Sequence, residues 1–204
     1  AHLVEKYQLQ DKVVVLFVGN LQPFKGLHVL VKAMAQIDDP RIVLLIVGGG
    51  YEEQAIRSQV ATLGIENKVI FAGPQSPAGG LPDHYRLGDF LVLPSTYSES
   101  FGLVVLEAMA TGMPAIVSSL PGPSQLVDDG NDGLVVRGGD VDDLKFSIEF
   151  LAKHPEARKA MGQQARGKVL ERYSWDSIGL QLEAVLMDLA KRSTQKNSTD
   201  SVND

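Results

Sequence analysis

Two carboxylates, Glu99 and Glu107, stand eight residues apart across a predicted junction between a strand and a helix. An apolar run ends at Pro94, a polar turn follows, and the helical spacing after it stops at Gly112, where a C-cap is expected. Glu99 is therefore predicted to precede a helix. The first N–H groups of a helix lack intrahelical acceptors and carry the positive end of its dipole, so this position suits a phosphate.

The same junction is predicted to bind two parts of one ligand. The expected phosphate donors are the backbone N–H groups of Ser100, Phe101, Gly102 and Leu103. Gly102 allows a ligand to approach the backbone closely. Glu107 follows Glu99 by about two helical turns. It can accept hydrogen bonds from sugar hydroxyls, as acidic residues do for ribose in dinucleotide-binding folds. One element could thus bind a diphosphate and a sugar together.

A second loop adds a positive charge. The predicted first strand ends at Val18 and is followed by Gly-Asn-Leu-Gln-Pro-Phe-Lys-Gly, with the lysine at position 25. Lys25 lies near the start of the next predicted helix, where its ammonium would stand beside the helix-terminal donors. Together these groups could neutralise a diphosphate.

The carboxylate segment resembles a motif of a known enzyme family. Its wording, Glu-Ser-Phe-Gly-Leu-x-x-x-Glu with Pro-Ser before it and Ala-Met-Ala-x-Gly-x-Pro after it, is similar to the Glu-x7-Glu motif of the retaining, nucleotide-sugar-dependent glycosyltransferases called family 4. The resemblance implies that Glu99 approaches the donor sugar, that the amides of 100–103 hold the diphosphate, and that Glu107 binds the ribose. It also implies that Lys25 binds the leaving diphosphate, so Lys25 and Glu99 are the expected catalytic residues.

The chain departs from the family pattern in two loops. The family wording of the first loop is Gly-Arg-Leu-x-x-x-Lys-Gly, and this chain has Gly19 followed by Asn20 where arginine is usual. Asn20 offers neutral hydrogen bonds in place of a charge-assisted fork, which is about twice as strong per bond. In the loop after the fifth strand, Gln125 stands where the family has glutamate. We expect Gly19 and Asn20 to contact the donor nonetheless.

Two further loops are less informative about the ligand. Backbone groups near Ile70 and Phe71 resemble the family's base-binding edge, which leaves the nucleobase undetermined. The run Gly48-Gly49-Gly50 invites a dinucleotide-binding interpretation, but Glu53 stands where the third glycine is required. A carboxylate there would repel a pyrophosphate at the helix start. We favour a tight turn.

Composition excludes several classes of function. The chain has 204 residues with 44% hydrophobic content, enough for one well-buried domain. Its net charge is −6 without a long basic cluster, which argues against nucleic-acid binding. The chain has no cysteine, which excludes disulfide and thiol chemistry and agrees with a cytoplasmic location. We see no His, Asp and Glu cluster at metal-ligand spacing, so no metal is expected. The four histidines are expected to be surface or packing residues, with His84 in a loop.

Short β-rich runs alternate with amphipathic stretches. The predicted strands are Val13–Val18, Ile42–Val47, Val69–Ala72, Phe90–Leu93, Ala115–Val117 and Leu134–Val136. The predicted helices are Gly26–Ile37, Glu52–Leu63, Phe101–Thr111, Ser124–Val127, Val141–Lys153, Pro155–Arg172 and Trp175–Ala190. Nearly continuous apolar strands separated by helices indicate an α/β, doubly wound, Rossmann-like parallel sheet. Residues 1–193 are predicted to form this nucleotide-sugar-binding domain, and residues 194–204 a disordered tail.

The resemblance implies one half of the two-domain architecture called GT-B. This chain would be the carboxyl-terminal, donor-binding domain of a retaining hexosyltransferase, with the nucleoside-diphosphate sugar as co-substrate and no further cofactor. An amino-terminal domain outside this sequence would bind the acceptor and make any peripheral membrane contact. The isolated domain is therefore expected to bind donor without transferring sugar.

Two alternatives remain open. A binding module without transfer activity is consistent with the departures at Asn20 and Gln125. A glycosidase could use Glu99 and Glu107 as acid and nucleophile, if their carboxyl groups flank a sugar bond at the required separation. That alternative leaves Lys25 and the phosphate-ready helix start unexplained.

Overall fold

The computed structural model describes the backbone of residues 2–200 and the side chains of residues 2–189. Contacts between Cα atoms divide the chain into two compact units, residues 1–166 and 167–204. The first unit contains the whole sheet and every residue singled out above as a site residue. The predicted end of the domain, residue 193, lies within the second unit and stays a prediction.

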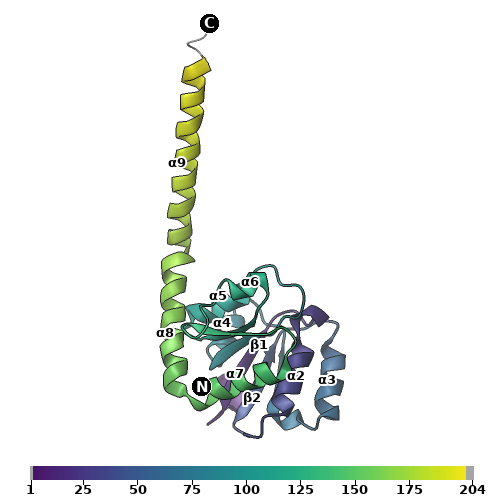
Figure 1. Ribbon diagram of the computed structural model, residues 1–204. Coiled ribbons are helices and arrows are strands. Elements are labelled where there is room, and N and C mark those ends of the chain that lie inside the picture. Colours follow the sequence, from purple (N-terminus) through teal and green to yellow (C-terminus); the bar gives the residue numbers. More distant parts are fainter. Residues whose placement is uncertain (1, 201–204) are drawn as a thin grey trace. The chain divides into compact units, whose positions relative to one another are not determined.

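The first unit is built on a six-stranded parallel sheet with the order β3-β2-β1-β4-β5-β6 (Figure 1). The strands are β1 (Val13–Val18), β2 (Ile42–Val47), β3 (Val69–Gly73), β4 (Phe90–Leu93), β5 (Ala115–Ser118) and β6 (Gly133–Val136). All six predicted strands are present, and each bound differs from the prediction by no more than one residue. The prediction of a doubly wound, Rossmann-like sheet is confirmed.

The central strands are apolar on both faces because both faces are covered. Every residue of β2, β4 and β5 is buried. Phe17 and Phe90 are among the largest fully buried side chains. Burial on both sides explains why these strands show continuous apolar runs in the sequence and no alternation.

Helices lie on both sides of the sheet (Figure 1). On one side α2 (Leu27–Ala35) packs against α3 (Glu53–Thr62) and α7 (Val141–Lys153). On the other side lie α4 (Leu81–Tyr85) and α5 (Leu103–Ala110). The chain leaves β1 toward β2 and later returns to β4 on the opposite flank of β1, so the strand order reverses between β1 and β4. Ligands of such sheets bind at this reversal, beyond the carboxyl ends of the strands.

The short elements are where the sequence prediction was wrong. The helix predicted at Ser124–Val127 lies earlier, as α6 (Pro121–Ser124). A proline at the first helical position loses no hydrogen bond there, so Pro121 begins the helix where we expected a loop. The sequence also gave no signal for α1 (His2–Lys6) or α4, because each has only five residues.

The remaining helices are α8 (Pro155–Arg172), which crosses the boundary between the units, and α9 (Trp175–Asp200). Helix α9 continues through residues 194–200, where a disordered tail is predicted, and residues 201–204 lie outside the described residues.

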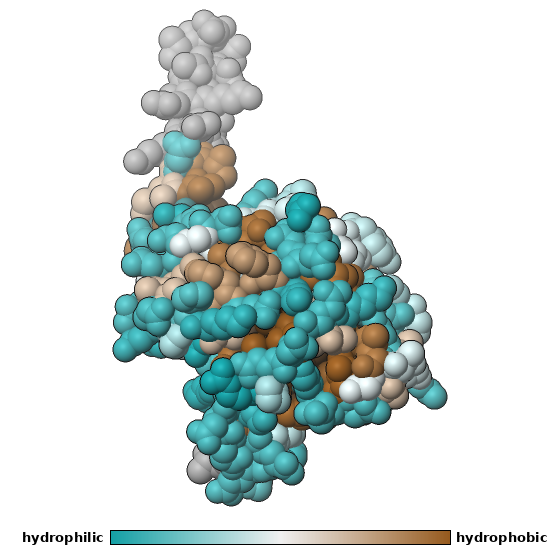
Figure 2. All heavy atoms as spheres, turned by 60° about the horizontal axis from the view of Figure 1, so that its bottom comes forward, coloured by the Kyte–Doolittle hydropathy of each residue, from teal (hydrophilic) through white to brown (hydrophobic). Residues whose placement is uncertain are grey.

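Among the described helices, none combines the length and apolar character that a bilayer crossing requires. On the face shown in Figure 2, polar side chains cover much of the surface and apolar ones show between them in separate patches.

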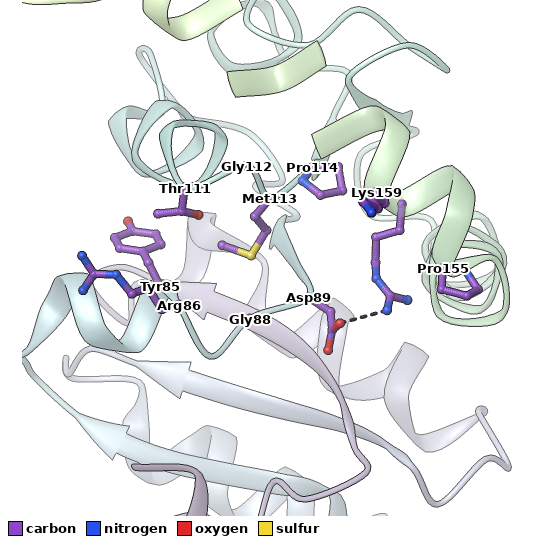
Figure 3. Close-up of a pocket in the computed structure, with 11 residues that line it drawn as sticks. Tyr85, Arg86, Gly88, Asp89, Thr111, Gly112, Met113, Pro114, Pro155 and Lys159 are labelled. Atoms are coloured by element: carbon purple, nitrogen blue, oxygen red, sulfur yellow. Dashed lines mark ion pairs between the residues drawn. The ribbon is translucent and has the colours of Figure 1, made fainter. Parts of the chain in front are cut away.

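Asp89 anchors the amino ends of the central strands. Its Oδ2 accepts a hydrogen bond of 2.8 Å from the N–H of Val14, at the start of β1. Its Oδ1 pairs with Nη2 of Arg158 on α8 at 2.9 Å, the dashed line in Figure 3. Nη1 of Arg158 in turn donates to the carbonyl of Leu151 on α7. One carboxylate thus joins β1, the start of β4 and the beginning of α8.

We predict that Asp89→Ala lowers the free energy of unfolding by about 2 kcal/mol, because it leaves a buried N–H and the Arg158 guanidinium without their acceptor. Urea unfolding of the chain measures this change. Asp83→Ala is the matched control: Asp83 pairs with Arg86 on the surface, with side chains 61% and 67% exposed. Its loss should cost less than about 0.5 kcal/mol. Equal costs for the two variants would contradict the anchoring role of Asp89.

Candidate functional site

The loops that follow β1 and β4 touch each other at the strand reversal. Gly26 has φ +69°, and a Cβ added there would lie 1.9 Å from the carbonyl oxygen of Pro94. The N–H of Thr96 donates a 2.8 Å hydrogen bond to the carbonyl of Phe24. Only glycine permits this approach without strain, and the two loops are joined by their backbones.

This approach brings the two predicted catalytic side chains into direct contact. Nζ of Lys25 lies 2.5 Å from Oε2 of Glu99, and the side chains are only 17% and 10% exposed. The same oxygen accepts a 3.2 Å hydrogen bond from the hydroxyl of Ser95, which is buried. Lys25 also lies over the ring of Phe24, 5.4 Å from its centroid. An ammonium and a carboxylate are therefore held as a pair at the edge of the sheet.

The helix after Glu99 begins later than predicted. Its N-cap is Gly102, with φ +91°, and its first residue is Leu103, so Ser100 and Phe101 precede the helix. Glycine has no side chain to cap the helix, and no capping hydrogen bond from a side chain is present at this end. The N–H of Val105 donates a 2.8 Å hydrogen bond to the carbonyl of Gly102, so the first-turn N–H groups that can meet an anion are those of Leu103 and Val104. The side chains of Phe101 and Leu103 are exposed.

The loop after β5 packs against the backbone of the segment that precedes α5. A Cβ added to Gly122, in α6, would lie 2.4 Å from the carbonyl oxygen of Glu99 and 2.7 Å from that of Ser100. Gly122 therefore allows this loop to approach the backbone of Glu99 and Ser100, where a side chain would overlap it. Gln125, which replaces the family's glutamate, is exposed at the C-cap of α6.

Glu107 has a partner that sequence reasoning missed. Its Oε2 accepts a 2.5 Å hydrogen bond from the hydroxyl of Tyr85, which lies on α4 and is 4% exposed. Burial, together with the hydrogen bond to the carboxylate, raises the pKa of Tyr85. No sequence spacing pointed to Tyr85, because the contact joins two helices that are 22 residues apart.

The glycine turn after β2 packs against Gly19 and Asn20. A Cβ added to Gly48 would lie 1.9 Å from the carbonyl of Gly19, and one added to Gly50 would lie 2.7 Å from Oδ1 of Asn20. The three glycines therefore serve a tight turn against the first loop, as predicted. The Asn20 side chain is exposed beside this turn.

The predicted base-binding residues are not gathered with the others. Ile70 lines a hollow with Val43 and Lys12, near the amino ends of the strands. Phe71 points to the other face of β3, where the guanidinium of Arg57 stacks 3.9 Å from its ring centroid. The side chains of Ile70 and Phe71 thus lie away from the Lys25–Glu99 pair, and a role in base binding stays a prediction for their backbone groups.

The histidines and acidic groups form no further centre in the described part of the chain. His84, predicted in a loop, is buried in α4, where its ring bonds the hydroxyl of Tyr7 and the carbonyl of Gly80. It is a packing residue. Within the described residues, no group of three histidine, cysteine, aspartate or glutamate side chains is arranged to hold a metal ion.

The six-stranded parallel sheet with helices on both faces defines a Rossmann-like α/β domain, and comparison with known proteins specifies the family. The family described as "Glycosyl transferases group 1" matches residues 3–168. This match covers most of the chain, which therefore belongs to that family.

Two relatives illustrate the range of the family. The chain is 36% identical over 167 residues to a D-inositol 3-phosphate glycosyltransferase of Kribbella flavida, a match that covers 76% of this chain. It is 32% identical over 194 residues to a GDP-mannose-dependent phosphatidylinositol monomannoside mannosyltransferase of Mycolicibacterium smegmatis, covering 91% of this chain. The matches cover 39% and 50% of those two proteins. The chain thus spans at most about half the length of these relatives.

Solved structures agree with this placement. HepE of Anabaena in complex with UDP superposes with a TM-score of 0.85 at 26% identity, over 92% of this chain and 52% of HepE. Sucrose-phosphate synthase of Thermosynechococcus elongatus superposes with a TM-score of 0.82 at 32% identity, over 93% of this chain and 49% of the synthase. The fold is that of one half of these enzymes.

We predict that Gly26→Ala destabilises the chain more than Gly64→Ala, although the two glycines have nearly the same φ, +69° and +67°. A Cβ at Gly64 meets nothing within 4 Å, so that variant suffers only the left-handed strain of about 1 to 2 kcal/mol. Gly26→Ala adds overlap with the Pro94 carbonyl, which should cost about 1 to 3 kcal/mol more. Urea unfolding compares the two variants, and similar losses would show that the loops do not depend on this contact.

Proposed function

We propose that this chain is the donor-binding half of a retaining glycosyltransferase, which moves a hexose from a nucleoside diphosphate to an acceptor. The nucleoside-diphosphate sugar would be the co-substrate, with no metal or other cofactor. The remaining part of the active site would come from a further domain that binds the acceptor. The protein would act in the cytoplasm, with any contact to a membrane surface made by that domain.

One observation carries the proposal: the ammonium of Lys25 pairs with Glu99 at the strand reversal, and Glu99 comes three residues before the uncapped start of α5 at Gly102. A diphosphate at this point would meet a positive charge and free N–H donors together. Glu99 holds the ammonium there, because its carboxylate oxygen is 2.5 Å from Nζ of Lys25. A bound diphosphate would compete with Glu99 for Lys25.

The proposed reaction requires donors that stabilise the negative charge of the leaving diphosphate. Transfer breaks the bond between the anomeric carbon and a diphosphate oxygen and forms a bond from that carbon to the acceptor oxygen, while the acceptor's hydroxyl proton passes to the leaving diphosphate. Negative charge grows on the diphosphate as the bond breaks. Donors that are fixed before the reaction stabilise such charge without reorganising. Lys25 and the N–H groups of Leu103 and Val104 are the proposed donors, and Glu99 is the carboxylate that we propose faces the sugar.

The comparisons support transfer over the two alternatives. The family and the two curated relatives are named as transferases, and HepE has been solved with UDP and with UDP-glucose. In this chain Glu99 pairs with Lys25 and Glu107 with Tyr85, so the two carboxylates have separate partners. Neither the description of the family nor the names of the two curated relatives indicate a glycosidase.

We predict that Lys25→Ala weakens binding of UDP or GDP by at least about tenfold, since a hydrogen bond to a charged group is worth about 1.5 to 3 kcal/mol. Binding of uridine or guanosine should change by less than about twofold, because a nucleoside carries no phosphate for Lys25 to contact. Isothermal titration calorimetry with the four ligands measures the difference. Lys153→Ala, which removes an exposed ammonium paired with Glu149, is the matched control.

Equal losses for the diphosphate and the nucleoside would show that Lys25 acts on the fold and not on phosphate. Removal of Lys25 also leaves the Glu99 carboxylate with only Ser95, so the double variant Lys25→Ala/Glu99→Ala separates the lost attraction from new repulsion. The double variant should bind the diphosphate better than Lys25→Ala alone, but worse than the unmodified chain.

We predict that the 204-residue chain binds its donor and transfers no sugar. Acceptor positioning and exclusion of water lower a barrier by several kcal/mol, and both would need the further domain. Incubation with UDP-glucose or GDP-mannose and a panel of acceptors, followed by mass spectrometry of the products, tests this. Sustained transfer by this chain would mean that residues 1–204 contain a complete active site.

A further inference from the structure

The Glu107 carboxylate is held on one side by a second helix. The hydroxyl of Tyr85, on α4, donates to Oε2 of Glu107 over 2.5 Å. Hydrogen bonds of this length are typical of a hydroxyl donating to an ionised carboxylate, and they are about twice as strong as neutral ones. The bond therefore fixes a side chain on α5 from outside that helix.

The two partners differ in burial. Tyr85 is 4% exposed, whereas Glu107 is exposed. Because burial and the carboxylate raise the pKa of Tyr85, its hydroxyl keeps its proton and remains a donor. An exposed glutamate by itself samples several rotamers. The bond to Tyr85 selects those that place Oε2 against α4, which leaves Oε1 for a donor from outside the protein.

Glu107 is within reach of a nucleotide bound at the start of α5. It follows Leu103 by four residues, about 6 Å along the helix axis. A ribose is joined directly to the phosphates, so phosphates at the helix start bring its hydroxyls near Glu107. Glu107 and Tyr85 also line one pocket of about 240 Å³, together with Pro77, Leu81, Pro82 and Thr111.

We propose that Tyr85 is a positioning residue for Glu107, whose second carboxylate oxygen it orients toward the ribose hydroxyls of the nucleotide. This inference rests on the proposed function, since it requires a nucleotide at α5. Tyr85 itself does not touch the ligand in this arrangement. It makes the protein favour ribose over a sugar without hydroxyls, because only ribose satisfies the pre-oriented oxygen.

The test is Tyr85→Phe in the full chain, which removes one hydroxyl and keeps the ring. Calorimetry would measure the dissociation constants of UDP and GDP and of their 2′,3′-dideoxy analogues. We expect the ribonucleotide to bind about tenfold more weakly to the variant, in line with the loss of one charge-assisted contact. The dideoxy analogue should bind to both proteins within about twofold. A purely structural role of Tyr85 would weaken both nucleotides alike.

Tyr7→Phe is the matched control. Its hydroxyl bonds Nε2 of His84 at 3.0 Å, so this variant also removes a phenol hydroxyl that contacts α4, one residue from Tyr85. It should leave the preference for ribose unchanged. Glu107→Ala, at an exposed position, provides a second route: it should abolish the same preference with Tyr85 intact, and Tyr85→Phe should then have no further effect.

Two results would overturn the inference. The first is an unchanged preference for ribose in Tyr85→Phe, which includes an equal loss for both nucleotides. The second is a retained preference in Glu107→Ala. If the unmodified chain binds neither UDP nor GDP, the proposed function itself is wrong and this inference falls with it.

Discussion

The site depends on how closely the backbones of neighbouring loops approach at the carboxyl edge of the sheet. Gly48, Gly26 and Gly122 each stand where a Cβ would overlap a carbonyl oxygen of another loop, at 1.9, 1.9 and 2.4 Å. These contacts join the loops after β2, β1, β4 and β5 in the order of the strands. Because the loops are joined, the ammonium of Lys25 and the carboxylate of Glu99, 74 residues apart in sequence, lie within 2.5 Å of each other.

Much of the fold could be predicted, because strands buried on both faces leave a signal in each short window of sequence. The runs at β1, β2 and β4 were located to the residue, since their ends coincide with turn residues. The start of α5 was less certain: the apolar spacing begins at Phe101, but Gly102 adopts a left-handed conformation and delays the helix to Leu103. We expected a loop at α6 because its two prolines are typical of turns, but proline is also favoured at the first helical position.

The side-chain contacts of the site were less predictable. The sequence motif selected Lys25, Glu99 and Glu107, but no pattern indicated that the first two pair or that Glu107 bonds Tyr85. Such contacts depend on how α4 and α5 lie on the sheet, which local spacing does not determine. Phe71 is a further example. The sequence correctly placed it on β3, but the guanidinium of Arg57 covers its ring, and this contact depends on how α3 packs against the sheet.

Backbone amide NMR during titration with UDP and with GDP would test most directly whether the nucleotide binds at the strand reversal. The account predicts that the largest chemical-shift changes occur at Gly26 and Leu103, whose N–H groups flank the Lys25–Glu99 pair. Gly64 and Ile65, which follow α3 and precede β3 at the opposite edge of the sheet, should change little. Saturable changes centred on Gly64 and Ile65, with Gly26 and Leu103 unaffected, would contradict it.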